Sequence, residues 1–125
     1  MFSNAIIKTF VPTVNPAEAK IFYGDVLGFK LLGEDNYALE FDANGTLLRV
    51  IIVPELTPQA FTVLGWNVPG IETTIRALNN KGVFFEKYDF DFMLQDELGV
   101  WVSPNGSKVA WFKDPDGNIL SLTQS

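Results

Sequence analysis

Apolar positions along the chain follow two patterns, one typical of strands and one typical of helices. Short runs that mix β-branched and aromatic residues, some alternating with polar ones, are typical of strands. Strands are therefore predicted at residues 5–11, 29–32, 37–42, 46–53, 61–68, 83–86, 100–103, 108–113 and 119–123. Pro12 is expected to end the first strand. Residues 91–99 follow neither pattern, so we expect a loop or a short helix there.

Two other stretches repeat their apolar residues at steps of three and four, as one face of a helix requires. Asn15 suits the N-cap of the first helix, and Pro16 suits its first turn. Its apolar stripe consists of Ala19, Phe22, Tyr23 and Val26. Gly28 fits the left-handed position just past its end. A second helix is predicted over residues 71–81, with Gly82 as the matching stop.

The order of strand, helix, glycine and strand occurs twice. At an offset of 54 residues, three pairs are identical: Glu18 with Glu72, Ile21 with Ile75, and Gly28 with Gly82. The apolar pattern stops at residues 54–59, which contain two prolines and are the best candidate for a linker. We therefore predict two βαβββ modules, at about residues 1–56 and 59–125. Neither can bury its own sheet face, so residues 1–125 are expected to form a single domain of the α+β class.

Asn44 and Gly45 predict a two-residue hairpin turn, because such a turn needs positive φ at both positions. A two-residue turn here sets the register of the hairpin and places Glu40 opposite Arg49. One face of the hairpin is then apolar and carries Tyr37, Leu39, Phe41, Leu48, Val50 and Ile52. Glu40 and Arg49 share the other face with Ile51. They form either an exposed ion pair or an orienting pair in a cavity.

Composition excludes several kinds of catalysis. The chain has no Cys and no His, which excludes disulfides, thiolate and imidazole metal ligands, and a Ser-His couple. Fifteen acidic against nine basic residues give a charge of −6, which disfavours nucleic acid and anionic membranes as partners. No apolar run approaches the roughly 20 residues of a membrane span, and the N-terminus lacks an export signal. We therefore expect a cytoplasmic protein.

Two motifs point to a family. Residues 22–29 read Phe-Tyr-Gly-Asp-Val-Leu-Gly-Phe after Asn15-Pro16, and residues 114–118 read Asp-Pro-Asp-Gly-Asn. With the paired modules, these motifs resemble the vicinal oxygen chelate superfamily, which includes glyoxalases, bleomycin resistance proteins and extradiol dioxygenases. The resemblance implies a curved mixed sheet in each module, a cup that receives a small molecule, and a homodimer.

In metal-using members of that superfamily, four positions on the floor of the cup hold His, Glu or Gln around a divalent ion. The resemblance places Lys8, Val63 and Ser121 on three of these positions. Arg49 or its neighbour Ile51 lies nearest the fourth. Lys and Arg are cations that accept no hydrogen bond, and Val has no polar atom. The resemblance is therefore to a metal-free member with no cofactor.

Aromatic residues supply the remaining candidates for a ligand site. Phe10, Trp66, Trp101 and Trp111 lie in or beside predicted strands, and each is either a core residue or a ring face for a ligand. An acidic chain with aromatic strands suits a flat or cationic ligand, because ring faces attract positive charge. Lys8 either protects a strand edge or binds an anionic group of a ligand.

The sequence therefore predicts a metal-free protein that binds a small organic molecule in a cleft between its two modules, for sequestration or resistance. The predicted ligand-binding residues are Lys8, Phe10, Glu40, Arg49, Ile51, Val63, Trp66, Trp101, Trp111 and Ser121. Two alternatives stay open. One is a lyase, isomerase or dioxygenase-like enzyme of the same fold, and the other is an interaction domain without a ligand.

Overall fold

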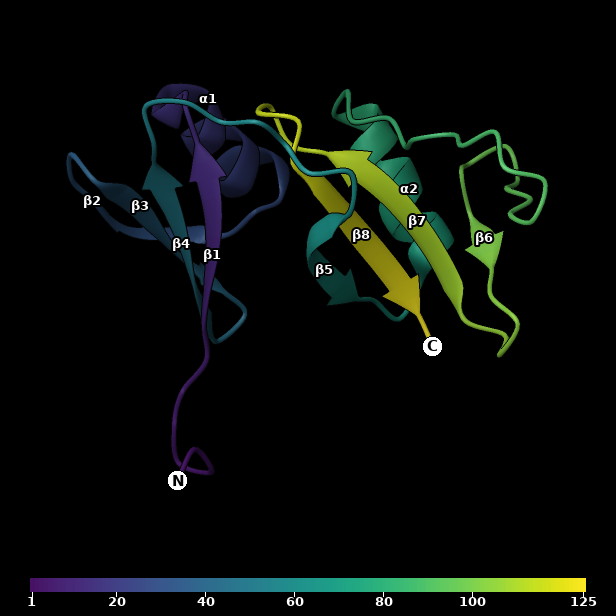
Figure 1. Cartoon of the computed structure of the whole chain (residues 1–125), viewed down its shortest axis with the longest axis horizontal. Helices are drawn as coiled ribbons and strands as arrows, with labels where there is room; N and C mark the ends of the chain where they lie inside the picture. Colours follow the sequence, from purple (N-terminus) through teal and green to yellow (C-terminus); the bar gives the residue numbers. More distant parts are fainter. The chain divides into compact units, whose positions relative to one another are not determined.

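A computed structural model describes all 125 residues, and the chain divides into two compact units, Met1–Thr57 and Pro58–Ser125. Each unit has one four-stranded sheet, with a parallel pair at one edge and antiparallel pairs elsewhere (Figure 1). The boundary falls inside the proline-containing stretch at residues 54–59. Both units have the order βαβββ, which confirms the predicted α+β class. No helix is long and apolar enough to cross a membrane.

The first unit contains β1 (Lys8–Thr13), α1 (Pro16–Lys20), the π-helix η1 (Ile21–Val26), β2 (Lys30–Glu34), β3 (Ala38–Ala43) and β4 (Thr46–Ile52). Its strands are ordered β1-β4-β3-β2. One face of the sheet is buried, and its buried apolar residues include Val11, Leu39, Phe41, Leu48 and Val50. The ring centroid of Tyr23 in η1 lies 6.1 Å from that of Phe41, so the helical segment supplies the cover of this face.

The first helix begins as predicted and continues in a form that the sequence pattern did not indicate. Asn15 Oδ1 accepts a hydrogen bond from the N–H of Glu18 at 3.3 Å, which caps the helix. From Ile21 the helix widens, and the N–H of Leu27 donates to the carbonyl of Phe22 at 2.9 Å. This wider turn keeps Phe22 and Tyr23 both buried. Gly28 then takes a φ of +83° and ends the helix.

The first strand begins later and ends later than predicted, at Lys8 and Thr13 rather than at residues 5 and 11. Pro12 therefore lies inside it. The carbonyl of Thr13 accepts from the N–H of Val53 at 2.9 Å. Because alternate residues of an edge strand bond to its one neighbour, the backbone of Pro12 points away from β4, and its missing N–H removes no bond from the ladder.

The hairpin of β3 and β4 has the predicted register. Asn44 and Gly45 have φ values of 55° and 94°, as the predicted turn requires. Glu40 lies opposite Arg49, and the neighbouring pairs follow in step.

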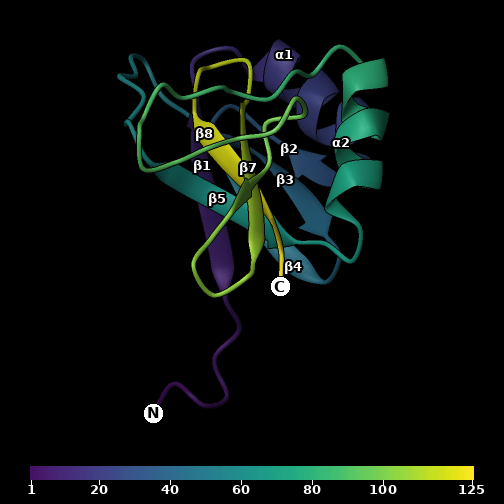
Figure 2. The same ribbon diagram turned by 90° about the vertical axis from the view of Figure 1, so that its right-hand side faces the viewer.

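The second unit contains β5 (Thr62–Asn67), α2 (Ile71–Asn80), β6 (Trp101–Val102), β7 (Lys108–Lys113) and β8 (Ile119–Gln124). Its strands are ordered β5-β8-β7-β6, and α2 covers one face of the sheet (Figures 1 and 2). The helix buries Ile71, Ile75 and Leu78 on this side, where Leu120 and Leu122 of β8 are also buried.

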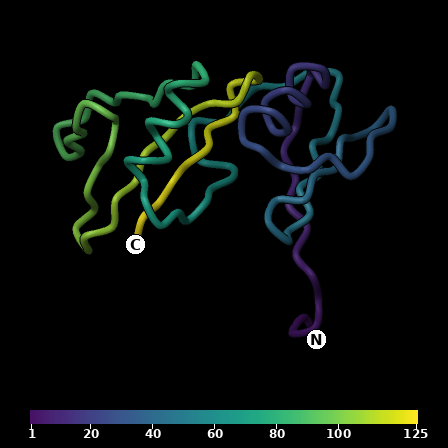
Figure 3. The backbone as a smooth tube through the Cα atoms, turned by 180° about the vertical axis from the view of Figure 1, so that it is seen from behind, coloured from purple at the N-terminus to yellow at the C-terminus, as the bar shows by residue number.

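The predicted strand at residues 83–86 is wrong. This segment makes one backbone bond to the sheet, from the N–H of Glu86 to the carbonyl of Trp111 at 2.7 Å. The strand beside β7 is instead β6, so the predicted strand at residues 100–103 is present but only two residues long. Figure 3 shows the irregular path between α2 and β6. Residues 91–99 are loop, as one of the two expectations had it.

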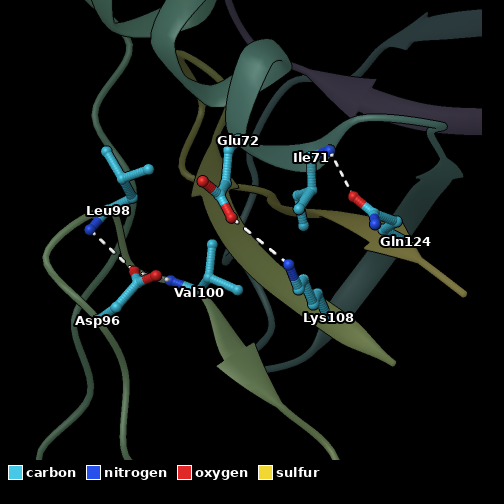
Figure 4. Close-up of polar contacts among 7 residues, drawn as sticks. All are labelled: Ile71, Glu72, Asp96, Leu98, Val100, Lys108 and Gln124. Carbon is cyan, nitrogen blue, oxygen red and sulfur yellow. Dashed lines mark hydrogen bonds and ion pairs between the residues drawn. The ribbon is translucent and has the colours of Figure 1, made fainter. Parts of the chain in front are cut away.

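A side chain from β8 completes the start of α2. The helix begins after Gly70, which has no side chain to act as a cap. Gln124 Oε1 accepts from the N–H of Ile71 at 2.9 Å, and Glu72 pairs with Lys108 of β7 at 3.4 Å (Figure 4). The N–H of Ile71, one of the free N–H groups of the first helical turn, thus has its acceptor in the sheet.

Candidate functional site

Five of the predicted site residues lie on the open face of the first sheet, meaning the face opposite the one that the helical segment covers. They are Lys8, Phe10, Glu40, Arg49 and Ile51. Phe10 of β1 and Glu40 of β3 both lie beside Arg49 of β4, one on each side. The alternate residues of the three strands point to the covered face, and among them Val11, Leu39, Phe41, Leu48 and Val50 are buried. Pairing and alternation thus bring these five side chains to one surface.

Glu40 and Arg49 form a close ion pair that is neither fully buried nor freely exposed. The distance from Arg49 Nη1 to Glu40 Oε2 is 2.8 Å, and the side chains are 28% exposed for Arg49 and 33% for Glu40. Both residues line a cavity of about 220 Å³ together with Gly33, Glu34, Asp35 and Ala38. The pair is therefore oriented at the rim of a small cavity.

Asp35 adds a carboxylate to the same cavity. Its Oδ1 accepts hydrogen bonds from the N–H of Tyr37 at 2.8 Å and from that of Ala38 at 3.0 Å. These two backbone bonds lower the pKa of Asp35 below its ordinary value, and the nearby charge of Arg49 lowers it further. The cavity therefore keeps a negative charge well into the acid range.

Lys8 is exposed at the start of the edge strand β1. Its Nζ lies 6.0 Å from the centroid of the Phe10 ring, a geometry compatible with a weak cation–π contact. Phe10 is itself 52% exposed. Lys8 thus lies beside an exposed ring of the open face. Its two expected roles, protection of a strand edge and binding of an anionic group, both stay predictions.

The chain's side chains do not fit the divalent ion that the superfamily's metal-using members hold. Lys8 can only donate hydrogen bonds, and Arg49 is a permanent cation already paired with Glu40. Val63 has no donor or acceptor, and Ser121 offers one hydroxyl. No group of three or more Asp, Glu, His or Cys side chains is arranged to bind a metal ion.

In the second unit, three predicted residues share the open face of the sheet. Trp111 lies opposite Ser121 of β8, and Trp101 lies opposite Val109. The indole centroids of Trp101 and Trp111 are 6.2 Å apart. The open face of this unit therefore carries two adjoining indoles beside a small hydroxyl.

The two other predicted residues of the second unit lie apart from these indoles. Trp66 lies opposite the buried Leu122 and stacks on the buried ring of Phe112 at 6.3 Å, on the side that α2 covers. Val63 lies at the irregularity of β5 and is half-buried. A ligand-binding role for either residue stays a prediction.

The loop before β6 contains a stack of three aromatic side chains that the sequence pattern did not predict. Tyr88 and Phe90 have ring centroids 6.0 Å apart with an angle of 16° between planes, and Phe90 and Phe92 are 5.3 Å apart at 13°. Tyr88 contacts Trp111 edge to face at 5.7 Å, which joins the stack to the indoles. The available signal was the strict alternation of aromatic residues with aspartates over residues 88–92.

The environment of Tyr88 differs from that of the exposed rings beyond it. Partial burial raises the pKa of its hydroxyl above the ordinary value, and the nearby Glu86 carboxylate raises it further. Tyr88 therefore keeps its proton, and its capacity to donate a hydrogen bond, throughout the physiological range.

Comparisons with known proteins agree on the fold. A glyoxalase family protein from Enterococcus faecalis is 25% identical over 99% of this chain and 100% of that chain, with a TM-score of 0.76. A member of the glyoxalase/bleomycin resistance protein/dioxygenase superfamily from Sphaerobacter thermophilus is 20% identical, with full coverage of both chains (100% and 100%) and a TM-score of 0.75. A bleomycin-binding protein, solved in complex with bleomycin, is 19% identical over 95% of this chain and 97% of that chain, with a TM-score of 0.70.

No protein-family model matches the sequence, and no curated protein matches it. The paired βαβββ units and the solved structures nevertheless agree along almost the whole chain. The chain therefore has the fold of the glyoxalase/bleomycin resistance protein/dioxygenase superfamily, which confirms the resemblance to the vicinal oxygen chelate superfamily.

Proposed function

We propose that this protein binds a small organic molecule, aromatic or cationic in character, without a metal ion. The observation that carries the proposal is the arrangement of Glu40 and Arg49 at the rim of a cavity, with exposed Phe10 on the same sheet face. Ligand sites of proteins combine apolar walls with a few oriented polar groups, and this face has both. Sequestration of the ligand is the role that fits a site of this kind.

The absence of competent metal ligands supports the metal-free part of the proposal. A divalent ion needs oxygen or nitrogen acceptors, whereas the corresponding positions hold Lys8, Val63 and Ser121 together with Arg49 or Ile51. Two cations near one another would repel the ion. Binding must therefore rely on shape, ring contacts and the charges of side chains.

The character of the ligand follows from charge and aromatic content. The chain carries a net charge of −6, and the open faces present Phe10, Trp101 and Trp111. Ring faces and a negative field both attract planar or positively charged molecules. A bleomycin-binding protein with the same fold supports small-molecule binding as a use of this architecture. That the open faces line one cleft stays a prediction.

Native mass spectrometry of protein purified from its source tests the proposal directly. We expect a bound organic molecule of constant mass, and we expect its occupancy to fall in an Arg49→Met variant. A Lys20→Met variant is the matched control, because Lys20 forms an exposed ion pair of the same 2.8 Å length with Glu34 in the same unit. A protein that never carries a ligand would contradict the proposal. Release of a chemically altered molecule would instead support the enzyme alternative.

The homodimer is part of the same proposal. Large apolar side chains before and within the edge strand β1 are exposed, and they are Met1, Phe2, Ile6, Ile7 and Phe10. An exposed strand edge flanked by apolar residues favours pairing with another chain. Sedimentation at micromolar concentration should give about twice the chain mass of 13.9 kDa, and a mass near 13.9 kDa would contradict the dimer.

A further inference from the structure

A cavity of about 520 Å³ in the second unit is lined in part by Phe92, the last ring of the aromatic stack formed by Tyr88, Phe90 and Phe92. Its lining residues are Phe92, Leu94, Gln95, Asp96, Val100, Trp101 and Val102. This volume is within the range of about 300 to 1,000 Å³ that is common for small-molecule sites. One aromatic side chain of the lining comes from the loop, and one comes from β6.

Phe92 lines this cavity and is stacked on one other ring. Its only ring contact is with Phe90, and the residue is 80% exposed. Trp101, in contrast, is held on the sheet by its contact with Trp111. A planar molecule in the cavity could extend the existing stack by one ring, because offset stacking is favourable at centroid spacings of about 4.5 to 7 Å.

Gln95 holds the loop that carries the stack. Its Oε1 accepts from the N–H of Tyr88 at 2.7 Å, and its Nε2 donates to the carbonyls of Glu86 at 3.0 Å and Gly99 at 2.8 Å. The side chain thus ties both ends of the loop together through three backbone bonds. An amide is suited to this position, because it both accepts and donates.

Asp96 also lines this cavity and accepts two backbone hydrogen bonds. Its Oδ1 accepts from the N–H of Leu98 and from that of Val100, both at 2.9 Å (Figure 4). Residues 86–99 of the loop also carry Glu86, Asp89, Asp91 and Glu97, against one cation, Lys87, whose Nζ donates to the carbonyl of Asp96 at 2.8 Å. The charge around the aromatic stack therefore favours a positively charged ligand over an anionic one.

We propose that this cavity binds a planar organic cation, with a ring of the ligand stacked on Phe92 and bordered by Trp101, and that Gln95 is the positioning residue for the stack. This cavity is separate from the Glu40–Arg49 cavity of the first unit, and the proposal rests on the proposed function only for the class of ligand. Its location, in the loop before β6, depends on the second unit alone. In this site the aromatic stack binds the ring of the ligand, and the carboxylates of the loop favour a positively charged ligand.

A fluorescence titration with the planar cation thioflavin T tests the site. Phe92→Leu keeps an apolar side chain and removes the ring face, so we expect dye binding to weaken roughly five- to tenfold. Phe61→Leu is the matched control, since Phe61 is an exposed phenylalanine of the same unit outside the cavity lining, and it should leave binding unchanged.

The role of Gln95 is tested with a double variant. Gln95→Ala should weaken dye binding, because the loop loses its three backbone bonds and the stack loses its position. If Gln95 acts through Phe92, adding Gln95→Ala to Phe92→Leu should cause little further loss. A general structural role would instead weaken binding by the same factor in both backgrounds.

Any of four results would overturn the proposal. The dye fails to bind up to about 1 mM, or Phe92→Leu and Phe61→Leu weaken dye binding equally. Alternatively, the effects of Gln95→Ala and Phe92→Leu on the free energy of dye binding are additive, or the anion 1-anilinonaphthalene-8-sulfonate binds as tightly as the dye. The fate of the proposed function is decided separately by native mass spectrometry. A natural ligand found in a protein that does not bind the dye would overturn only the location inferred here. A protein that binds the dye but carries no ligand from its source would contradict only the sequestration role.

Discussion

Removal of Glu40 should destabilise the first unit by more than an exposed ion pair would allow. Glu40→Ala deletes a charged hydrogen bond of 2.8 Å and leaves the guanidinium of Arg49, which is only 28% exposed, without that partner. Hydrogen bonds to charged groups contribute about 1.5 to 3 kcal/mol, whereas exposed pairs contribute about 0 to 1 kcal/mol. Because each side chain still reaches solvent, we expect a loss of about 2 kcal/mol, near the lower end of the first range.

A double-mutant cycle separates the pair from its surroundings. Urea unfolding of Glu40→Ala, Arg49→Met and the double variant should give a coupling free energy of about 1 to 1.5 kcal/mol. The double variant should lose less than the sum of the single losses, because no unpaired charge is left in a half-buried place.

The first unit contains its own control for this cycle. Lys20 Nζ and Glu34 Oε1 are also 2.8 Å apart, but these side chains are 47% and 46% exposed. The same cycle with Glu34→Ala and Lys20→Met should give a coupling of about 0.3 kcal/mol. Equal coupling free energies for the two pairs would refute the reasoning, since burial would then make no difference at the open face.

Three further outcomes are expected. In urea melts, Gly65→Ala should destabilise the second unit by about 1 kcal/mol, because an added Cβ would lie 2.6 Å from Ser121 Oγ. Adding Ser121→Gly should restore part of the loss, and an unchanged urea midpoint for Gly65→Ala would contradict this close approach. Asp114→Ala should lower the free energy of unfolding by more than about 3 kcal/mol, since the buried carboxylate accepts hydrogen bonds from the backbone N–H groups of Asp116 and Asn118 and from the Asn118 side-chain amide. Urea unfolding measures this loss, and a loss below about 1 kcal/mol would contradict the prediction. The pKa of Asp35 is lower in the folded protein, so its contribution to stability is complete above the unfolded pKa of about 3.9 and is lost as the pH falls through the folded value. Asp35→Asn should therefore make the stability less dependent on pH in that window, as measured by acid unfolding. An unchanged acid profile would argue against the two backbone bonds.

Local signals in the sequence were sufficient for most of the elements and for the hairpin register. The Asn44-Gly45 turn, the Asn15 cap and the glycines after both helices depend on residues that are adjacent in the chain. Such signals act within a few residues, so no knowledge of distant packing is needed to use them. The strand alternation then follows, and it placed Glu40 and Arg49 on one face correctly.

Local sequence patterns did not predict which of two strand-like segments pairs with β7. Residues 83–86 have a strand-like composition, yet β6 occupies the position beside β7. Composition records only the suitability of a segment for a strand, whereas pairing depends on which segment reaches the free edge.

The same distinction separates the predicted from the unpredicted parts of the candidate site. The composition excluded thiolate and imidazole ligands, and the residues at the positions that the resemblance assigns to a metal ion, with Lys8, Val63 and Ser121 among them, form no competent ligand set. Only the tertiary structure decided that Trp66 lies on the covered face, and that Tyr88, Phe90 and Phe92 stack beside Trp111. Which face a tryptophan meets, and which rings touch, depend on contacts between residues far apart in the chain, which a local pattern does not encode.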